Sequence, residues 1–375
     1  MIRFGEPVTR WGGMLLLLIL TAGIIHRVGA DSTSTLYFPI VEYQAPTPTP
    51  TSTVTRTPTA TPTPTPTRTP TPTKDPGTPP RYSTSLYMKT INPLTLYSLG
   101  CVHGVRDMNL AGAQDSIVVL AFGRPTMSNE GIYGASLFGF GPASTTEIAE
   151  AVQQFGAGYV ACSLEDTESR LRIGAGTSNY GDPVAISWWD HGRKWARMVN
   201  DINTWFSNQG LRTRVDAVGA NDIELAWNNP TVTRAWVDGY DYANKYPYYD
   251  FGAVEGCPTR LAPNWSCSSP WTKNDVWYVS YGAGPAYPLP LIYATTGVNA
   301  RQWAWMSVYA VEQKGARMEF VGAFTQYQAC QQRGGCTGLD NEPDEGWQQL
   351  YNELKYDPRT AQTLRWSTDI KWWGE

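Results

Sequence analysis

The chain has 375 residues, of which 29 are Lys or Arg and 33 are Asp or Glu, giving a formal net charge of −4. A mildly acidic chain without basic clusters is not expected to bind nucleic acid or an anionic membrane surface. Only three histidines are present, which disfavours a metal centre built from several of them, and we expect neither a metal nor a cofactor.

The N-terminus has the pattern of an export signal. Arg3 and Arg10 precede an apolar run at 11–25, and the small-x-small sequence at 28–30 suits a leader peptidase. The run is too short to span a bilayer comfortably, so we expect a cleaved signal peptide over 1–30 and no stable insertion in a membrane. The protein is therefore expected to be secreted or held at the cell surface, on the bacterial exterior.

A Thr/Pro-rich linker follows a short apolar and polar segment at 31–45. Between Pro46 and Pro80, Thr and Pro alternate almost without interruption. Proline fixes φ and removes the backbone donor, so this tract is expected to stay extended and disordered. At ~3.1 Å per residue, it would span on the order of 100 Å. We expect the linker to separate the signal peptide from one folded domain over 81–375.

The expected domain contains all six cysteines. An even number of cysteines in an exported protein predicts disulfides, and no two of them have the C-x2-C spacing of a zinc site. Six cysteines allow about 15 sets of pairings. Proximity in the sequence favours Cys257 with Cys267, Cys330 with Cys336, and Cys101 with Cys162.

The domain begins with alternating β-rich and helical runs. We expect the first buried strand at Ser116–Phe122 and then a helix over Thr145–Phe155, capped by Ser144 or Thr145. The next strand is expected at Arg170–Ala175, with Gly158–Cys162 pairing nearby. An amphipathic helix that ends at Gly210 follows. Its apolar residues recur at three- and four-residue spacing: Trp195, Met198, Val199, Ile202, Trp205 and Phe206.

The same alternation continues to the C-terminus. Six further strands are expected at Val215–Ile223, Tyr249–Val254, Val276–Tyr281, Leu289–Tyr293, Met318–Phe324 and Leu364–Ile370. Helices fit between several of them, at Thr231–Lys245, Asn299–Lys314 and Glu345–Leu354. Strands that alternate with helices indicate a mostly parallel sheet, and eight strands predict an α/β fold, a single irregular (β/α)8 TIM-like barrel.

The chemically most informative motif is Asn221-Asp222-Ile223-Glu224, at the end of an expected strand. Function in such barrels lies at strand ends, and residues two apart on a strand share a face, with Cα atoms about 6.6 Å apart. Two close carboxyl groups can hold different protonation states. Glycosidic cleavage needs one acid to protonate the leaving oxygen and one carboxylate to stabilise or attack the cationic centre. We therefore predict Glu224 and Asp222 as catalytic residues.

Other side chains near expected strand ends are candidates for substrate binding. They are Trp227, Asp250, Glu255, Tyr293, Gln326 and Asp369. Aromatic rings can stack on sugars, and carboxyl or amide groups can bind hydroxyls. For Asp250 and Glu255 a solvated or hydrogen-bonded structural role is the competing interpretation. Gln326 is also consistent with a residue that only ends a strand.

The segment Val215–Trp227 resembles the D-x-E strand of barrel-fold muramidases (glycoside hydrolase family 25) and, more loosely, that of chitinase-type barrels. Those enzymes act on N-acetyl-amino-sugar polymers. The resemblance implies that Glu224 is the general acid and that Asp222 is its electrostatic partner or orients the substrate acetamido group. Pro290–Tyr293, before the helix at 299–314, is similar to a late strand of such barrels.

A second resemblance is to a group of exported bacterial proteins that share the Asn-Asp-Ile-Glu segment, a helix with Thr233-Arg234-x-Trp236, and Gly256-Cys257 after an aromatic strand. One departure from the muramidases is that Ser116–Phe122 runs into Gly123-Arg124-Pro125, where their first strand ends in an acidic residue. Two functions stay open. One is a monomeric secreted glycosidase acting on a cell-wall or environmental polysaccharide. The other is a non-catalytic surface module that binds a glycan or a partner protein.

Overall fold

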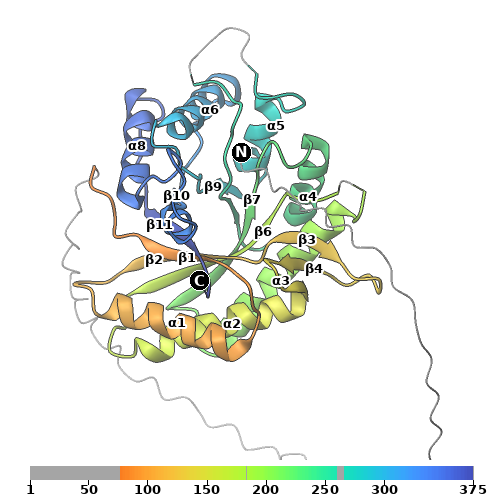
Figure 1. Cartoon of the computed structure of the whole chain (residues 1–375), viewed down its shortest axis with the longest axis vertical. Coiled ribbons are helices and arrows are strands. Elements are labelled where there is room, and N and C mark those ends of the chain that lie inside the picture. The colour runs from red at the N-terminus through yellow and green to blue at the C-terminus, as the bar shows by residue number, and fades with distance from the viewer. Residues whose placement is uncertain (1–76, 183, 260–265, 375) are drawn as a thin grey trace, which may run out of the picture. The chain divides into compact units, whose positions relative to one another are not determined.

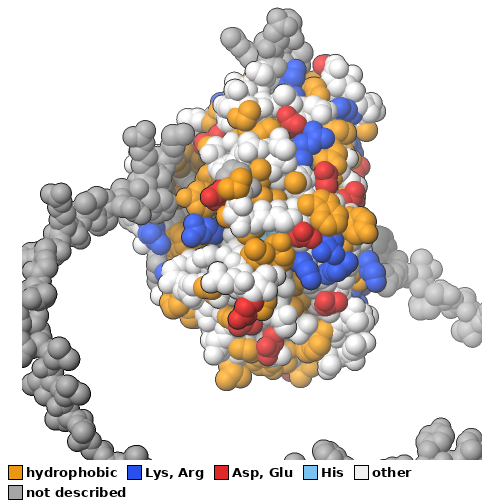
Figure 2. All heavy atoms as spheres, turned by 90° about the vertical axis from the view of Figure 1, so that its right-hand side faces the viewer, with side chains coloured by type: hydrophobic (Ala, Val, Ile, Leu, Met, Phe, Trp, Pro, Cys, Tyr) orange, Lys and Arg blue, Asp and Glu red, His pale blue; other side chains and the backbone are white. Residues whose placement is uncertain are grey.

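The computed structural model describes residues 77–182, 184–259 and 266–374, and all of them belong to one compact unit. The expected signal peptide, the 31–45 segment and the linker up to residue 76 lie outside the described residues. Among the helices in these ranges, none has both the length and the apolar character needed to cross a bilayer. Figure 2 shows acidic, basic and apolar side chains interspersed over one face of the domain.

Eight parallel strands form the central sheet, in the order β10-β11-β1-β2-β6-β7-β8-β9 (Figure 1). In chain order they are β1 Ser83–Tyr87, β2 Asp115–Ala121, β6 Arg170–Ser178, β7 Val215–Asp222, β8 Tyr248–Asp250, β9 Ala286–Pro288, β10 Gly322–Thr325 and β11 Trp366–Trp372. After β9, Leu291 bridges Phe324 of β10, and the Val321 N–H donates to the Pro288 carbonyl oxygen (3.0 Å). The sheet thus closes almost completely, which confirms the predicted (β/α)8 TIM-like barrel.

Helices connect successive barrel strands. They are α1 Pro93–Met108, α2 Thr145–Cys162, α3 Trp188–Asn208, α4 Pro230–Ala243, α5 Lys273–Trp277, α6 Val298–Lys314, α7 Tyr327–Gln332 and α8 Pro343–Tyr356. A π-helical turn, η1 Tyr278–Gly282, extends α5. A small antiparallel sheet is inserted between β2 and α2, and it consists of β3 Arg124–Met127, β4 Tyr133–Leu137 and β5 Gly141–Ser144.

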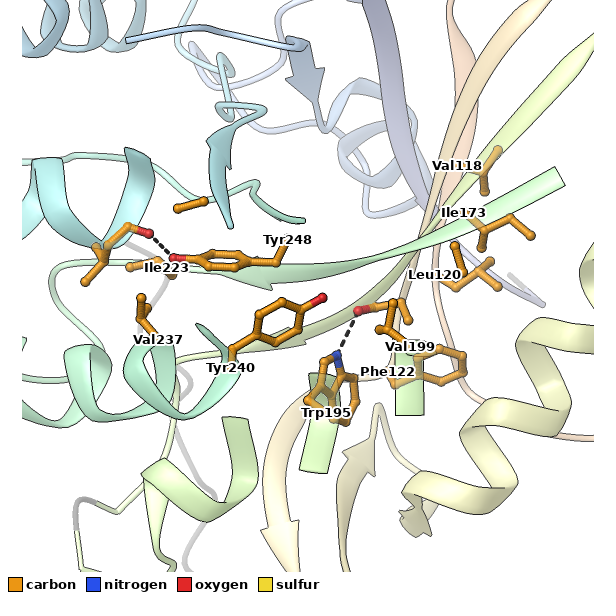
Figure 3. Packing of buried hydrophobic residues seen from close by; sticks show 14 of the residues in the cluster. Val118, Leu120, Phe122, Ile173, Trp195, Val199, Ile223, Val237, Tyr240 and Tyr248 are labelled. Carbon is orange, nitrogen blue, oxygen red and sulfur yellow. Dashed lines mark hydrogen bonds between the residues drawn. The ribbon is translucent and has the colours of Figure 1, made fainter. Parts of the chain in front are cut away.

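Side chains of the barrel strands alternate between two apolar layers, as the period of a strand requires. In β2, Ile117 and Val119 belong to the barrel interior, whereas Val118 and Leu120 pack in the layer between strands and helices. Figure 3 shows part of this outer layer, in which the Trp195 indole N–H donates to the Ala175 carbonyl oxygen (2.9 Å). The interior is therefore filled with side chains, and function is confined to the two ends of the barrel.

Neighbouring helices approach so closely that their contacts require glycine. A Cβ atom added to Gly100 of α1 would lie 1.9 Å from the carbonyl oxygen of Phe155 in α2, and one added to Gly192 of α3 would lie 1.9 Å from that of Trp236 in α4. Real side chains do not tolerate such contacts, so alanine at either position would force the helices apart.

All three predicted disulfides are present, as Cys101–Cys162, Cys257–Cys267 and Cys330–Cys336. The first joins α1 to the last turn of α2 across a sequence separation of 61 residues. The same turn corrects an expectation, because Gly158–Cys162 is helical and does not form a strand. The predicted cap at the start of α2 is confirmed, since Ser144 and Glu147 bond each other's backbone N–H.

The strand expected at Val276–Tyr281 is wrong, because this segment forms α5 and η1. Its β-branched and aromatic residues favour a strand locally. However, the Thr272 hydroxyl accepts from the Asp275 N–H (3.1 Å), and the Asp275 carboxylate accepts from the Thr272 N–H (3.0 Å). This reciprocal capping starts a helix and decides the conformation.

Two further strand expectations need correction. The first barrel strand is β1 and was not predicted, since its sequence, Ser-Thr-Ser-Leu-Tyr, is short and mostly polar; Ser116–Phe122 corresponds to the second strand, β2. The segment expected at Leu289–Tyr293 contributes only the bridge at Leu291, and the strand itself, β9, lies just before it. The other barrel strands overlap their predicted ranges.

Candidate active site

Strands β7 and β8 bring three acidic residues to the carboxyl end of the barrel. Val218 and Ala220 of β7 face the interior, so Asp222 points into the barrel mouth by alternation. Asn221 lies opposite Asp250, the last residue of β8. Asp222 and Glu224 are partly exposed and Asp250 is buried. As the register partner of Asn221, Asp250 lies on the strand next to the two predicted catalytic residues but on the face opposite to that of Asp222.

The mutual repulsion of these groups favours their protonated forms. Burial raises the pKa of Glu224 well above its usual range, and the charges of Asp222, Glu255 and Asp250 raise it further, against the Ala253 N–H that donates to Oε1 (3.2 Å). Burial and the charge of Asp250 also raise the pKa of Asp222. The raised pKa values of Asp222, Glu224 and Asp250 favour protonation of these three groups at a pH where isolated carboxyls are ionised.

The charge of Asp250 depends on pH and affects the pKa values of Asp222 and Glu224. Its carboxyl accepts hydrogen bonds from the Ser280 hydroxyl (2.6 Å) and the Gly252 N–H (3.1 Å). Burial raises its pKa to about 7, although these bonds partly oppose the shift. Asp250 therefore changes charge near neutral pH, and its charge acts on both Asp222 and Glu224.

One oxygen of the cluster has no internal partner. Asp222 Oδ1 is buried, and no hydrogen bond reaches it from the described residues. Buried polar atoms are normally hydrogen-bonded, and an exception in a cluster of titrating groups is a mark of function. The open acceptor lies on one of the two predicted catalytic residues.

Tyr293 and Glu255 also join the cluster, as predicted from their positions. The Tyr293 hydroxyl donates to the Glu255 carboxylate. Tyr293 is buried, and its pKa is raised by burial first, then by the charge of Glu224 and by its bond to Glu255. It therefore remains a neutral hydroxyl next to Glu224, while Glu255 is exposed at the rim.

The three other predicted substrate-binding residues differ in placement. Trp227 is 38% exposed, and its ring packs edge-on against Tyr180 (5.7 Å between centroids), so it is free to contact a ligand beside Glu224. Asp369 is fully buried within β11. Its carboxylate accepts from the Thr325 hydroxyl (2.7 Å) and from the first backbone N–H groups of α7. Gln326 donates to the Leu339 carbonyl oxygen (3.2 Å). The contacts of Asp369 and Gln326 favour structural roles.

Tyr87, at the end of β1, was not predicted because β1 was not. Its ring stacks on Trp372 of β11 (4.4 Å between centroids). Burial and then the charges of Asp222, Glu224 and Asp369 raise its pKa, so its hydroxyl stays neutral.

Asn179, directly after β6, holds the backbone of Glu224 in place. Its side-chain oxygen accepts from the Glu224 N–H (3.0 Å), and its amide nitrogen donates to the Glu224 carbonyl oxygen (3.0 Å). Asn179 is buried, and its amide also contacts the Thr233 hydroxyl (3.2 Å). The only sequence signal for this role of Asn179 is its position as a polar residue directly after the buried strand β6.

Asn179→Ala should lower the free energy of unfolding and the turnover of any substrate on which Glu224 acts. It leaves two backbone groups of Glu224 unsatisfied, at a cost of about 2 kcal/mol in the free energy of unfolding, and releases the segment that positions the acid. Asn200→Ala is the matched control, because Asn200 bonds Ala243 and Lys245 in the same two-point manner far from the cluster. Urea unfolding should detect a loss in both variants, but turnover should fall only for Asn179→Ala. Equal turnover in the two would contradict the positioning role.

The pKa of Asp250 predicts a pH-dependent stability. An unfolded Asp has a pKa of about 3.9, so the folded state binds this proton more tightly. Its contribution to stability is complete below about pH 4 and is lost as the pH rises through about 7, by at most about 1.4 kcal/mol per pH unit. Urea unfolding at a series of pH values should therefore show a flatter profile for Asp250→Asn than for the parent protein. Parallel profiles would mean that Asp250 is not the group that titrates.

Two measured cavities lie away from the acid cluster. A groove of about 590 Å³ runs between α2 and α3, and a pocket of about 140 Å³ lies at the amino ends of the strands. Neither is lined by Asp222 or Glu224. Within the described ranges, no group of three or more His, Cys, Asp or Glu side chains is arranged to hold a metal ion.

The chain is a (β/α)8 barrel with a cluster of interacting carboxyl groups at the carboxyl end of its strands. Its sequence matches no protein-family model and no curated protein. Its function therefore has to be inferred from the residues of the site.

Proposed function

We propose that this protein is a glycosidase that acts outside the cell on a cell-wall or environmental polysaccharide. The observation that carries the proposal is the Asp222–Glu224 pair at the end of β7, in which burial and three neighbouring carboxyls raise the pKa of Glu224. The resemblance of this segment to the D-x-E strand of muramidases supports the same chemistry. The three disulfides are typical of an exported protein.

In this mechanism the protonated Glu224 gives its proton to the glycosidic oxygen as the bond to the anomeric carbon breaks. Asp222, whose Oδ1 is without an internal partner, stabilises the positive charge that develops on the sugar or orients the group next to it. The hydroxyl of Tyr87 remains protonated and serves as a donor to the substrate, whereas the Tyr293 hydroxyl donates to Glu255 and can only accept from the substrate. Water then adds its hydroxyl to the anomeric carbon, and its proton restores the acid.

The test is the release of reducing ends from a panel of polymers by the purified, disulfide-bonded domain. Peptidoglycan, chitin-like and plant polysaccharides would each be incubated with the protein over a range of pH. Release from one class identifies the substrate. A folded protein that releases nothing from any of them would refute the proposal for these substrates.

A non-catalytic glycan-binding module is the second candidate. It is favoured by the neutral Tyr87 at the end of the first barrel strand, where the muramidases that the chain resembles carry an acid. Retention of the domain on a glycan column without any product release would support this module. Failure to retain it on any wall or glycan matrix would count against it.

A further inference from the structure

A small pocket at the amino end of the barrel gathers arginines from separate parts of the chain. It has a volume of about 140 Å³ and lies where β2, β6, β7 and β11 begin. Five of its lining residues are arginines, namely Arg170, Arg172, Arg212, Arg214 and Arg365. Two acidic residues, Asp115 and Asp216, also line it. The lining therefore carries more positive than negative charge, in a chain whose net charge is negative.

The two carboxylates are already paired. Asp216 receives a two-point bond from Arg172 (2.9 and 2.6 Å), whose remaining nitrogen donates to the Tyr249 hydroxyl (2.6 Å). Asp115 receives a two-point bond from Arg365 (2.5 and 3.0 Å). Two of the five positive charges are thus neutralised inside the pocket.

Three arginines remain without a carboxylate of their own. Arg214 bonds only neutral groups, the Ser169 carbonyl oxygen (2.6 Å) and the Ser163 hydroxyl (3.0 Å). The nearest carboxylate to Arg212 is the shared Asp216, at 3.7 Å, and its guanidinium also lies over the Tyr246 ring (5.2 Å to the centroid). Arg170 is exposed, and its guanidinium makes no hydrogen bond or ion pair with any residue that the structure describes. Arg170 and Arg212 therefore have unused donors at a solvent-accessible pocket.

We propose that this pocket binds a phosphate group. The planar guanidinium group of arginine can donate two parallel hydrogen bonds to the oxygens of a tetrahedral anion. An anion with more than one negative charge compensates the excess positive charge better than a carboxylate does. The volume of about 140 Å³ is enough to admit a small anion. The pocket lies at the opposite end of β7 from Asp222, so this site is separate from the candidate active site and does not depend on the proposed function.

The source of the phosphate is set by what the domain meets outside the cell. A phosphodiester in a surface polymer, a lipid headgroup and free phosphate all present anionic oxygens on a tetrahedral phosphorus, although a phosphodiester carries one negative charge and free phosphate up to two near neutral pH.

The first experiment is calorimetric titration of the domain with inorganic phosphate at constant ionic strength, with acetate as the competing anion. We expect one site for phosphate and at least about tenfold weaker binding in Arg170→Ala/Arg212→Ala, because each variant position removes a charge-assisted bond. The matched control is Lys194→Ala/Arg197→Ala, which removes two exposed positive charges from the α2–α3 groove. Near-identical circular dichroism and unfolding curves would establish that both variants are folded.

The outcomes separate the possibilities. Phosphate binding that is lost in the pocket variant and kept in the control supports the site. No phosphate binding, an equal loss in both variants, or acetate binding as tight as phosphate would overturn it. Co-sedimentation with a glycerol-phosphate polymer and with vesicles containing a phosphate-headgroup lipid then assigns the source, and binding to neither assigns free phosphate.

Discussion

Replacing Glu224 by Gln should lower the turnover of a susceptible polysaccharide by about 10²–10⁴-fold, the usual contribution of a general acid. Glutamine keeps the shape of the side chain and can still accept the Ala253 N–H, but it has no proton to give to the leaving oxygen. Initial rates of reducing-end release, measured near the pH optimum, provide the readout. KM should change much less than kcat, because the lost interaction belongs to the transition state.

The control for this variant is Glu150→Gln, which changes an exposed glutamate on α2 and should leave the rate within error of the parent. Glu224→Gln should also be more stable than the parent, since it removes a buried group whose ionisation is opposed by three neighbouring carboxyls. A Glu224→Gln protein with full turnover would exclude Glu224 as the acid.

The second large effect is on stability and comes from the disulfide between α1 and α2. Removing Cys101–Cys162 by a double change to alanine should lower the free energy of unfolding by about 4 kcal/mol, since the bond closes a loop of 61 residues. Removing Cys330–Cys336, which closes a loop of 6 residues, should cost only about 2 kcal/mol. Urea unfolding of the two variants and the parent measures both.

The order of these two losses is the critical result. If the short loop proved as costly as the long one, restriction of the unfolded chain would not be the source of the stabilisation. Gly100 allows the backbones of α1 and α2 to pack closely without the disulfide. The variant without Cys101–Cys162 should therefore keep this packing.

The fold was predictable where local patterns agreed with the final contacts. β2, β6 and β7 are long apolar strands buried on both faces, and the amphipathic pattern of α3 faces the barrel as expected. β1 was missed because a short polar strand acquires its place only by pairing with β2 and β11, which lie far along the chain. The strand expected at 276–281 failed because a local helix cap overrides β propensity there.

The candidate site was predictable to the same extent. Asp222 and Glu224 share one strand end, so their proximity follows from local geometry. Asn179 and Tyr87 reach the cluster from other strands, and only the register of the sheet brings them there. The arginine pocket had a faint sequence signal, two Arg-x-Arg triplets at Arg170–Arg172 and Arg212–Arg214. The sequence alone does not show that the two triplets line one pocket, because this follows from the pairing of β6 with β7.

The most direct test of the proposed chemistry is the release of reducing ends from purified peptidoglycan and chitin-like polymers, measured side by side for the domain and its Glu224→Gln variant. We predict release by the parent and almost none by the variant, both being folded and disulfide-bonded. Equal release by the two proteins would contradict the role of Glu224. No release by the parent from any polymer would contradict the glycosidase and favour the glycan-binding module.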